Sequence, residues 1–442
     1  MKVSGSPPYS LTEKVAITGL GGVCSLGNSI PEITGNFISG KSGIGKTADP
    51  WTGEFNLPAA RAENPPAIET DIHPQLARSM GKHLSLLLAS TQEALRMAGI
   101  GFGLFDPREI AFFAGMGMVD YHIEDLLSAV LKSTNSDGDL DYDKFYSVGC
   151  RDIYPLWPLG MLNNVIFCQA SIHFGLRGEN CVFSPHGDAG IQSVVEAARV
   201  LVDGKAKVAL AGGISEEISF ISLARARLNG LVGPGHEAFL GECGAMLILE
   251  PLSGALERGA GVLARIAGYD FSCGKDEKDG FTSRQAIESS ILGALSHAAL
   301  EPGGIDLVML GSLGQNEIEA VREIFGSGAD APAVASTAGA MGEMFAAGPI
   351  LNIAIGLSIS DLASLPLLSF SPAKVRSEEQ KVEINDAGCF TARSSARSAE
   401  SSARYAPAPV SRMLVNGISY EGRCASLIIE KTPVRPHETS SL

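Results

Sequence analysis

The chain has 442 residues, enough for one large domain or two fused ones, and its 45% hydrophobic content is typical of a well-buried core. A net charge of −15, without any dense cluster of lysine and arginine, argues against a nucleic-acid-binding surface. No stretch approaches the ~20 apolar residues of a membrane-spanning helix, so neither nucleic acid nor a membrane is expected as a partner.

The N-terminal residues lack the apolar core of a signal peptide, and eight scattered cysteines form no CxxC pair. Both features predict a cytoplasmic protein. The eight histidines show no metal-ligand spacing, and the glycines at 19–22 lack the later acidic residue of a dinucleotide site. We therefore expect no metal and no cofactor.

In chain order, short apolar strands alternate with amphipathic helices. The first half is predicted to hold strands at 15–18, 110–114, 182–184, 208–211 and 245–250 and helices at 83–98, 123–132, 162–174 and 188–203. The second half is predicted to hold strands at 262–269, 307–310, 410–416 and 424–430 and helices at 284–300, 317–325 and 344–359. Glycine turns are predicted after the first strand at 19–22 and after the strand at 208–211.

This alternation predicts a layered α/β fold with a duplicated unit, although no residue-level repeat is evident. We expect two halves, at 14–255 and 256–431, between a flexible leader at 1–13 and a disordered tail at 432–442. A Ser/Ala/Arg/Pro-rich stretch at 374–409 has almost no apolar anchors and predicts a mobile loop.

The segment CVFSPHGDAG at 181–190 is the most informative motif, because it predicts a strand, a tight turn and a helix. Acyl-transfer enzymes often display a nucleophile at such a turn, since the helix N-terminus lowers a thiol's pKa and stabilises an oxyanion. No cysteine or serine stands at the tip here, where His186, Gly187 and Asp188 follow Pro185.

Several co-linear segments from about residue 14 to 431 resemble the β-ketoacyl synthases of fatty-acid and polyketide assembly. They include VAITGLGGVCSLGNSI, FISGKSGI, NNVIFCQASIHFGLRGENCVFS, EAARVLVDGKAKVALAGGISE and GECGAMLILEPLSGALERGA. The resemblance implies a thiolase-like duplicated α/β fold, layered α-β-α-β-α. The activity it implies is that of a 3-oxoacyl-[acyl-carrier-protein] synthase, an acyltransferase.

The chemistry of that family uses one cysteine, two histidines and a lysine. Position by position, the cysteine falls on Gly187, the first histidine at or near Gly311, the lysine on Ala338 and the second histidine on Glu343. Glycine cannot replace a thiolate, and the carboxylate of Glu343 would repel a malonyl carboxylate. We therefore expect no catalytic residue at these positions.

A branch of the family with this pattern is the chain-length factors of type II polyketide synthases, to which GEMFAAGPILNIA is similar. The resemblance implies a non-catalytic subunit that pairs with an active ketosynthase, meets acyl carrier protein through that complex and shapes the acyl tunnel. That branch usually carries glutamine where this chain has Gly187, so a decarboxylase role is not supported.

Two alternatives remain open. His186 and Asp188, or Ser184, could support altered acyl-thioester chemistry, as an acyltransferase or a hydrolase, although Asp188 capping a helix is the simpler interpretation. Glu343 is likewise interpreted as opening a helix. Rescue by Cys181 is disfavoured, because it lies six residues before the turn in the strand. The chain could also be a homodimeric scaffold.

The resemblance also places candidate residues at a tunnel or an interface. The strand at 180–184, with Val182 and Phe183, corresponds to the strand that pairs across the family's dimer. The segment at 118–127 corresponds to one that faces the partner's tunnel, and its candidates recur at apparent helical spacing: Met118, Tyr121, His122 and Asp125. Tyr420, in the degraded closing glycine loop, is a further candidate.

Overall fold

The computed structural model describes residues 14–46, 58–63, 65–66, 81–101, 103–233, 236–277, 280–312, 314–328, 331–366, 383–384, 390–391 and 409–432. The predicted leader lies outside these ranges, as do the loop and the tail except for a few residues. Within the described residues, none of the helices has the length and apolar character to cross a membrane.

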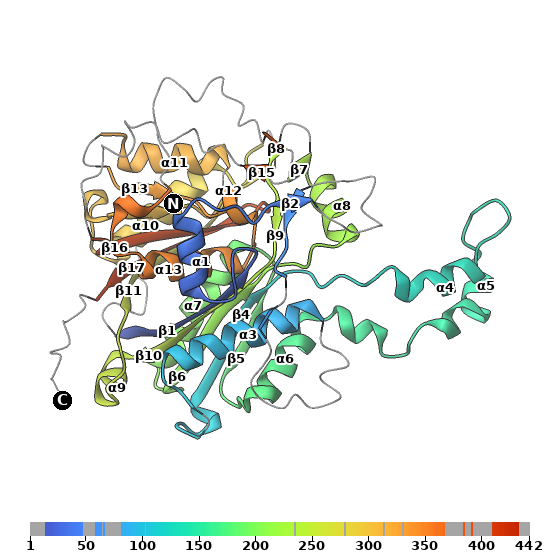
Figure 1. Ribbon diagram of the computed structural model, residues 1–442, viewed down its shortest axis with the longest axis horizontal. Helices are drawn as coiled ribbons and strands as arrows, with labels where there is room; N and C mark the ends of the chain where they lie inside the picture. Colours follow the sequence, from blue (N-terminus) through green and yellow to red (C-terminus); the bar gives the residue numbers. More distant parts are fainter. Residues whose placement is uncertain are drawn as a thin grey trace, which may run out of the picture.

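A mixed ten-stranded sheet, ordered β13-β12-β16-β17-β11-β1-β10-β6-β4-β5, forms the centre of the molecule (Figure 1). Its first five strands along the chain are β1 (Val15–Cys24), β4 (Ile110–Met116), β5 (Asn180–Phe183), β6 (Val208–Ile214) and β10 (Cys243–Pro251). The other five are β11 (Ala264–Cys273), β12 (Leu307–Met309), β13 (Ala333–Ala335), β16 (Arg412–Ile418) and β17 (Arg423–Lys431).

The two halves of this sheet repeat one topology. From the centre outwards, the first half runs β1-β10-β6-β4-β5 and the second runs β11-β17-β16-β12-β13. In each half the inner pairs are antiparallel and the outer pairs parallel, so both halves are mixed sheets. The expected duplication is confirmed. The proposed boundary at 255 falls within the short helix α9, between β10 and β11, and stays a prediction.

Helices cover the sheet in layers, as expected for the thiolase-like fold. The central layer contains α7 (Gly187–Val202) and α13 (Ala347–Ser358), which share one core with inward side chains of both sheet halves. Outside the first half lie α3 (Lys82–Met97) and α6 (Asn163–Phe174), and outside the second lie α10 (Arg284–His297) and α11 (Gln315–Phe325).

Shorter elements complete the described part of the chain. The remaining α-helices are α1 (Ile30–Ile38), α4 (Glu124–Lys132), α5 (Tyr142–Ser147), α8 (Phe220–Leu228), α9 (Leu252–Glu257) and α12 (Ala338–Met341). Two-stranded and three-stranded sheets use β2 (Gly45–Lys46), β3 (Pro58–Ala60), β7 (Val232–Gly233), β8 (His236–Glu237), β9 (Leu240–Gly241), β14 (Glu383–Ile384) and β15 (Phe390–Thr391). The 3-10 helices are η1 (Pro107–Glu109), η2 (Gly149–Asp152), η3 (Trp157–Met161), η4 (Pro302–Gly304) and η5 (Leu362–Ser364).

The predicted glycine turn at 19–22 is wrong, because β1 continues through it to Cys24. These glycines let the strand approach α3 closely: a Cβ at Gly19 would lie 2.3 Å from the carbonyl oxygen of Ala94. The strand at 208–211 likewise continues through its two glycines to Ile214. In both places glycine serves packing between layers and does not mark a turn.

A residue-level repeat, which sequence inspection missed, follows from the same packing. The register of β11 shifts just before Gly268, as that of β1 shifts just before Gly19. A Cβ at Gly268 would lie 2.5 Å from the carbonyl oxygen of Ala294, the counterpart of the contact at Gly19. Equivalent glycines thus seat α3 and α10 against equivalent strands.

Residues 118–162, here called the arm, leave the body after β4 and return at α6 (Figure 1). Within the arm, α4 and α5 pack on η2, and the ring of Tyr121 meets that of Trp157 edge-on at 5.6 Å. The arm carries most of the large exposed apolar side chains of the described chain, including Leu131, Tyr142, Tyr146, Tyr154 and Leu156.

Candidate functional site

Gly187 is the first residue of α7, at the position expected for a nucleophile. Its α-carbon faces the backbone at the end of β16: a Cβ here would lie 2.9 Å from both the nitrogen and the oxygen of Ile418. Real Cβ atoms do not approach backbone so closely, and packed backbone does not yield as a flexible side chain does. The place of a reactive side chain is therefore filled by the protein itself.

Gly311 meets the same segment, since a Cβ there would lie 2.6 Å from the carbonyl oxygen of Asn416. The structure thus brings Gly187 and Gly311 together on both sides of the residues that end β16. Neither site has room for the side chain that the family pattern expects.

Glu317, which sequence reasoning missed, organises this region. The carboxylate is buried and accepts hydrogen bonds from the backbone nitrogens of Gly311 and Ser312, from the Ser312 hydroxyl and from Asn416 Nδ2, all at 2.8–2.9 Å. Burial raises the pKa of Glu317, while these hydrogen bonds oppose the shift. The one sequence signal for this role is that Glu317 is an acidic residue at the start of the predicted helix at 317–325.

Ala338 and Glu343 lie in one short stretch between β13 and α13. Ala338 begins α12 and offers no ionisable group. Glu343 does not open a helix as expected: α13 begins only at Ala347, after Phe345 with its φ of 48°. Glu343 is joined to Leu240 by a β-bridge and accepts a hydrogen bond from the Phe345 nitrogen at 3.0 Å.

Burial raises the pKa of Glu343 to about 7, and the neighbouring Glu317 adds to the shift. The Phe345 hydrogen bond opposes it. A histidine in this place would donate a hydrogen bond to a thioester carbonyl, whereas a glutamate offers a carboxylate or a neutral acid at neutral pH.

His186 precedes α7 and is buried against two aromatic rings. Its ring centroid lies 4.2 Å from that of Tyr420 and 6.0 Å from that of Phe345. Burial lowers the pKa of His186 to about 4, and Arg423 and Arg225 add to the shift, so the imidazole is neutral at pH 7. Burial also raises the pKa of Tyr420 above its ordinary value.

Asp188 does not cap α7 as expected, because the N-cap residue is His186 and no side chain makes a capping hydrogen bond there. It lies in the first turn of the helix, where the positive end of the helix dipole stabilises its carboxylate. Its Oδ2 is 3.3 Å from Arg423 Nε, whereas His186 Nε2 faces Glu421 Oε1 at 3.9 Å. The two side chains therefore have different partners, which argues against a joint acid–base role for the pair. Ser184 and Cys181 are exposed, Cys181 on the edge strand β5.

A pocket of about 400 Å³ lies in front of His186. Its wall includes the three rings of His186, Phe345 and Tyr420, the thioether of Met118 and several charged groups, namely Glu216, Arg225, Lys275 and Glu421. These charged groups make the pocket poorly suited to a long alkyl chain, because an alkyl chain would desolvate them.

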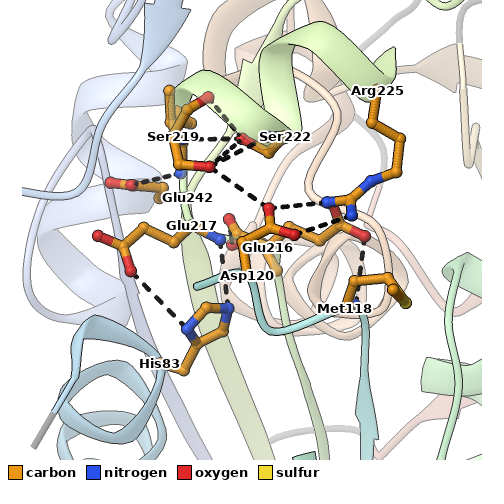
Figure 2. Close-up of polar contacts among 11 residues, drawn as sticks. His83, Met118, Asp120, Glu216, Glu217, Ser219, Ser222, Arg225 and Glu242 are labelled. Atoms are coloured by element: carbon orange, nitrogen blue, oxygen red, sulfur yellow. Dashed lines mark hydrogen bonds and ion pairs between the residues drawn. The ribbon is translucent and has the colours of Figure 1, made fainter. Parts of the chain in front are cut away.

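An ion network lies beside this pocket (Figure 2). Arg225, on α8, binds Asp120 through two hydrogen bonds of 2.9 Å and Glu216 through one of 2.8 Å. Burial raises the pKa of Glu216, and Arg225 opposes that shift. Sequence reasoning missed this network, since Asp120 and Arg225 are 105 residues apart.

The residues predicted to lie at a tunnel or an interface fall in three different places in the structure. Met118 is exposed and lines the pocket, while Tyr121, His122 and Asp125 are exposed on the arm. The helical spacing expected of them is wrong, because α4 begins only at Glu124. Val182 and Phe183 lie partly buried on β5, at the edge of the sheet.

The first part of the chain, residues 12–254, matches the family model described as "Beta-ketoacyl synthase, N-terminal domain". This match covers more than half of the 442 residues. The chain belongs to the β-ketoacyl synthase family. The resemblance drawn from its motifs is thereby confirmed.

Individual relatives of this family are distant. The 3-oxoacyl-[acyl-carrier-protein] synthase 2 of Staphylococcus aureus (strain COL) is 24% identical over 386 residues, which cover 81% of this chain and 88% of that protein. A β-ketoacyl synthase from Burkholderia phymatum superposes with a TM-score of 0.73 at 19% identity, covering 95% of this chain and 99% of that one. The ishigamide ketosynthase/chain length factor superposes with a TM-score of 0.71 at 20% identity and the same coverages. These similarities confirm the thiolase-like ketosynthase fold.

Proposed function

We propose that this chain is a non-catalytic, chain-length-factor-like subunit that pairs with an active ketosynthase and shapes its acyl tunnel. The backbone of Ile418 at Gly187 carries this proposal, because it leaves no room for a nucleophile. The family position of the first histidine, Gly311, is blocked by the same segment. Type II polyketide, polyene or fatty-acid-like assembly is the setting that fits such a subunit.

The partner surface fits this role. The arm exposes a row of large apolar side chains, and β5 leaves one edge of the sheet unpaired within the described chain. Exposed apolar area and open strand edges favour association or aggregation when left uncovered. An active ketosynthase of the same fold would cover both, burying well over ~2,000 Å² in total. Acyl carrier protein would then meet this chain only through the complex.

The test is co-expression with a synthase that has an intact cysteine and both histidines, encoded beside this chain. We expect the two to copurify and the pair to make products that the synthase alone does not make. Intact-mass spectrometry of this chain after incubation with acyl-carrier thioesters should detect no adduct. A stable acyl adduct on any residue would contradict the proposal. So would a chain that stays monomeric at micromolar concentration in the presence of the synthase.

A hydrolase is a second candidate, favoured by the neutral imidazole of His186 at the pocket wall, 3.9 Å from Glu421. A neutral histidine can act as a general base toward water. Thiol release from an acyl thioester, measured with the purified chain and with His186→Gln, decides between the candidates. Release that the substitution abolishes would favour hydrolysis. A homodimer without partner or activity would instead indicate a scaffold.

A further inference from the structure

The arm is held to the body at its root by the network around Arg225. Asp120, the third residue of the arm, accepts hydrogen bonds of 2.9 Å from both terminal nitrogens of the Arg225 guanidinium. The Met118 nitrogen donates to Glu216 Oε1 at 3.3 Å, and the Arg225 guanidinium donates to Glu216 Oε2 at 2.8 Å. Two carboxylates on either side of one guanidinium thus connect the arm to the body.

The helix that carries Arg225 is itself fixed to the arm. Ser219 is the N-cap of α8 and forms a capping box with Ser222. The Ser219 hydroxyl also donates to Asp120 Oδ2 at 3.3 Å, so the start of α8 and the root of the arm share one carboxylate. Figure 2 shows Arg225, Asp120 and Ser219 converging from α8 and from the segment after β4.

The charged side chains of this network are largely shielded from water, which strengthens the hydrogen bonds between them. The side chains of Asp120 and Glu216 are 10% and 6% exposed, and that of Arg225 is 27% exposed. A planar guanidinium that binds a carboxylate through two parallel hydrogen bonds fixes angle as well as distance, which a lysine ammonium does not. The pair therefore fixes the position of Asp120, near the start of the arm, relative to α8.

We propose that the Asp120–Arg225–Glu216 network is a latch that orients the arm and so pre-organises its apolar surface for the partner subunit. This inference rests on the proposed pairing with a ketosynthase. Holding a binding surface in its bound orientation before association reduces the ordering cost of binding. Residues of the latch act through the arm and are positioning residues.

Asp120→Asn and Arg225→Lys test the latch in the full-length chain, because both keep side-chain size and remove the charge or the bidentate geometry. We expect the dissociation constant for the co-expressed synthase to rise about 10-fold in each, which corresponds to about 1.4 kcal/mol. Amide hydrogen exchange within 118–162 of the unpartnered chain should accelerate, while exchange in β1 and β10 stays unchanged. The double variant should lose much less affinity than the sum of the two single losses, since the Asp120–Arg225 pair is already broken in each single variant.

Lys207→Met is the matched control, because it breaks an exposed 2.8 Å ion pair with Glu109 outside the arm. It should leave affinity and arm exchange unchanged. Wild-type affinity and wild-type arm exchange in both latch variants would overturn the inference. Additive losses in the double variant would also overturn it. If the unmodified chain does not bind the synthase at all, the proposed function fails instead, whereas the exchange measurement still tests the latch.

Discussion

The turn at Gly187 and the arm at 118–162 belong to one subunit and differ in what surrounds their key residues. At the turn, a single added carbon would lie 2.9 Å from the Ile418 backbone, so nothing can be added. On the arm, Tyr146 is 72% exposed and Leu131 is 65% exposed, so large apolar side chains face solvent there. Internal packing thus leaves no room for a side chain in one region, while another region keeps a large exposed apolar surface.

The largest effect is expected from charging the arm. Leu131→Asp combined with Tyr146→Asp should weaken binding to the synthase about 1,000-fold, about 4 kcal/mol, because buried unpaired carboxylates and lost apolar contacts both oppose association. The melting temperature of the isolated chain should hardly change, since both side chains are exposed. Titration of the labelled synthase with each variant measures the effect.

Leu256→Asp is the matched control for that experiment. Leu256 is 62% exposed, close to the value for Leu131, and lies on α9, far from the arm (Figure 1). Its affinity should equal that of the unmodified chain. Equal weakening by Leu256→Asp would show that the arm has no special part in binding.

The second effect concerns the turn. Gly187→Cys should destabilise the fold by about 3 kcal/mol, because the Ile418 backbone must move to admit the side chain. No acyl transfer to the new thiol is expected. Gly254→Ala, in α9, has no atom within 4 Å of the added carbon and should be neutral or slightly stabilising. Urea unfolding and intact-mass spectrometry measure both outcomes; unchanged stability with a cysteine adduct would refute the packing argument.

A third effect follows from the raised pKa of Glu343, about 7 in the folded chain against an ordinary 4.5. The folded state binds the proton more tightly, so this contribution to stability is full below pH 4.5 and is lost as the pH rises through about 7. Glu343→Gln keeps the acceptor for the Phe345 nitrogen and should make the chain about 3 kcal/mol more stable than wild type at pH 8.

The same substitution should change little at pH 4, where Glu343 is protonated. Unfolding free energies of both proteins between pH 4 and 8 measure this difference. A gap between the two that stays constant across the range would contradict the assignment of the shift to Glu343.

The smallest effect is expected at the boundary between pocket and arm. Met118 is 52% exposed and lines the pocket, so Met118→Ala should cost little stability. If its bulk limits a growing chain, the reconstituted pair should release longer products, since overlap of one methylene with a packed wall costs about 1 kcal/mol. Leu104→Ala, equally exposed at 52% but outside the arm, is the control. Unchanged product length would restrict Met118 to a structural role.

Local pattern alone determined much of this protein. Apolar periodicity located most strands and helices of both halves, because side chains repeat every second residue in strands and about every 3.6 residues in helices. It missed α1, α8 and the three-residue strand β13, which is too short to show a period. The segment CVFSPHGDAG located the turn, since its residues are contiguous and every family position near it can be counted. The missing nucleophile could therefore be predicted before any contact was known.

Tertiary structure alone decided the rest, because the deciding contacts join residues far apart in the chain. The roles of Gly19 and Gly268 depend on the carbonyls of Ala94 and Ala294, which lie against them only in the folded chain. The latch between Asp120 and Arg225 spans 105 residues and leaves no periodic signal. That Gly187 cannot hold a side chain depends on Ile418, which is distant in sequence, lies at the end of β16 in the other half of the sheet and meets the turn only in the folded structure.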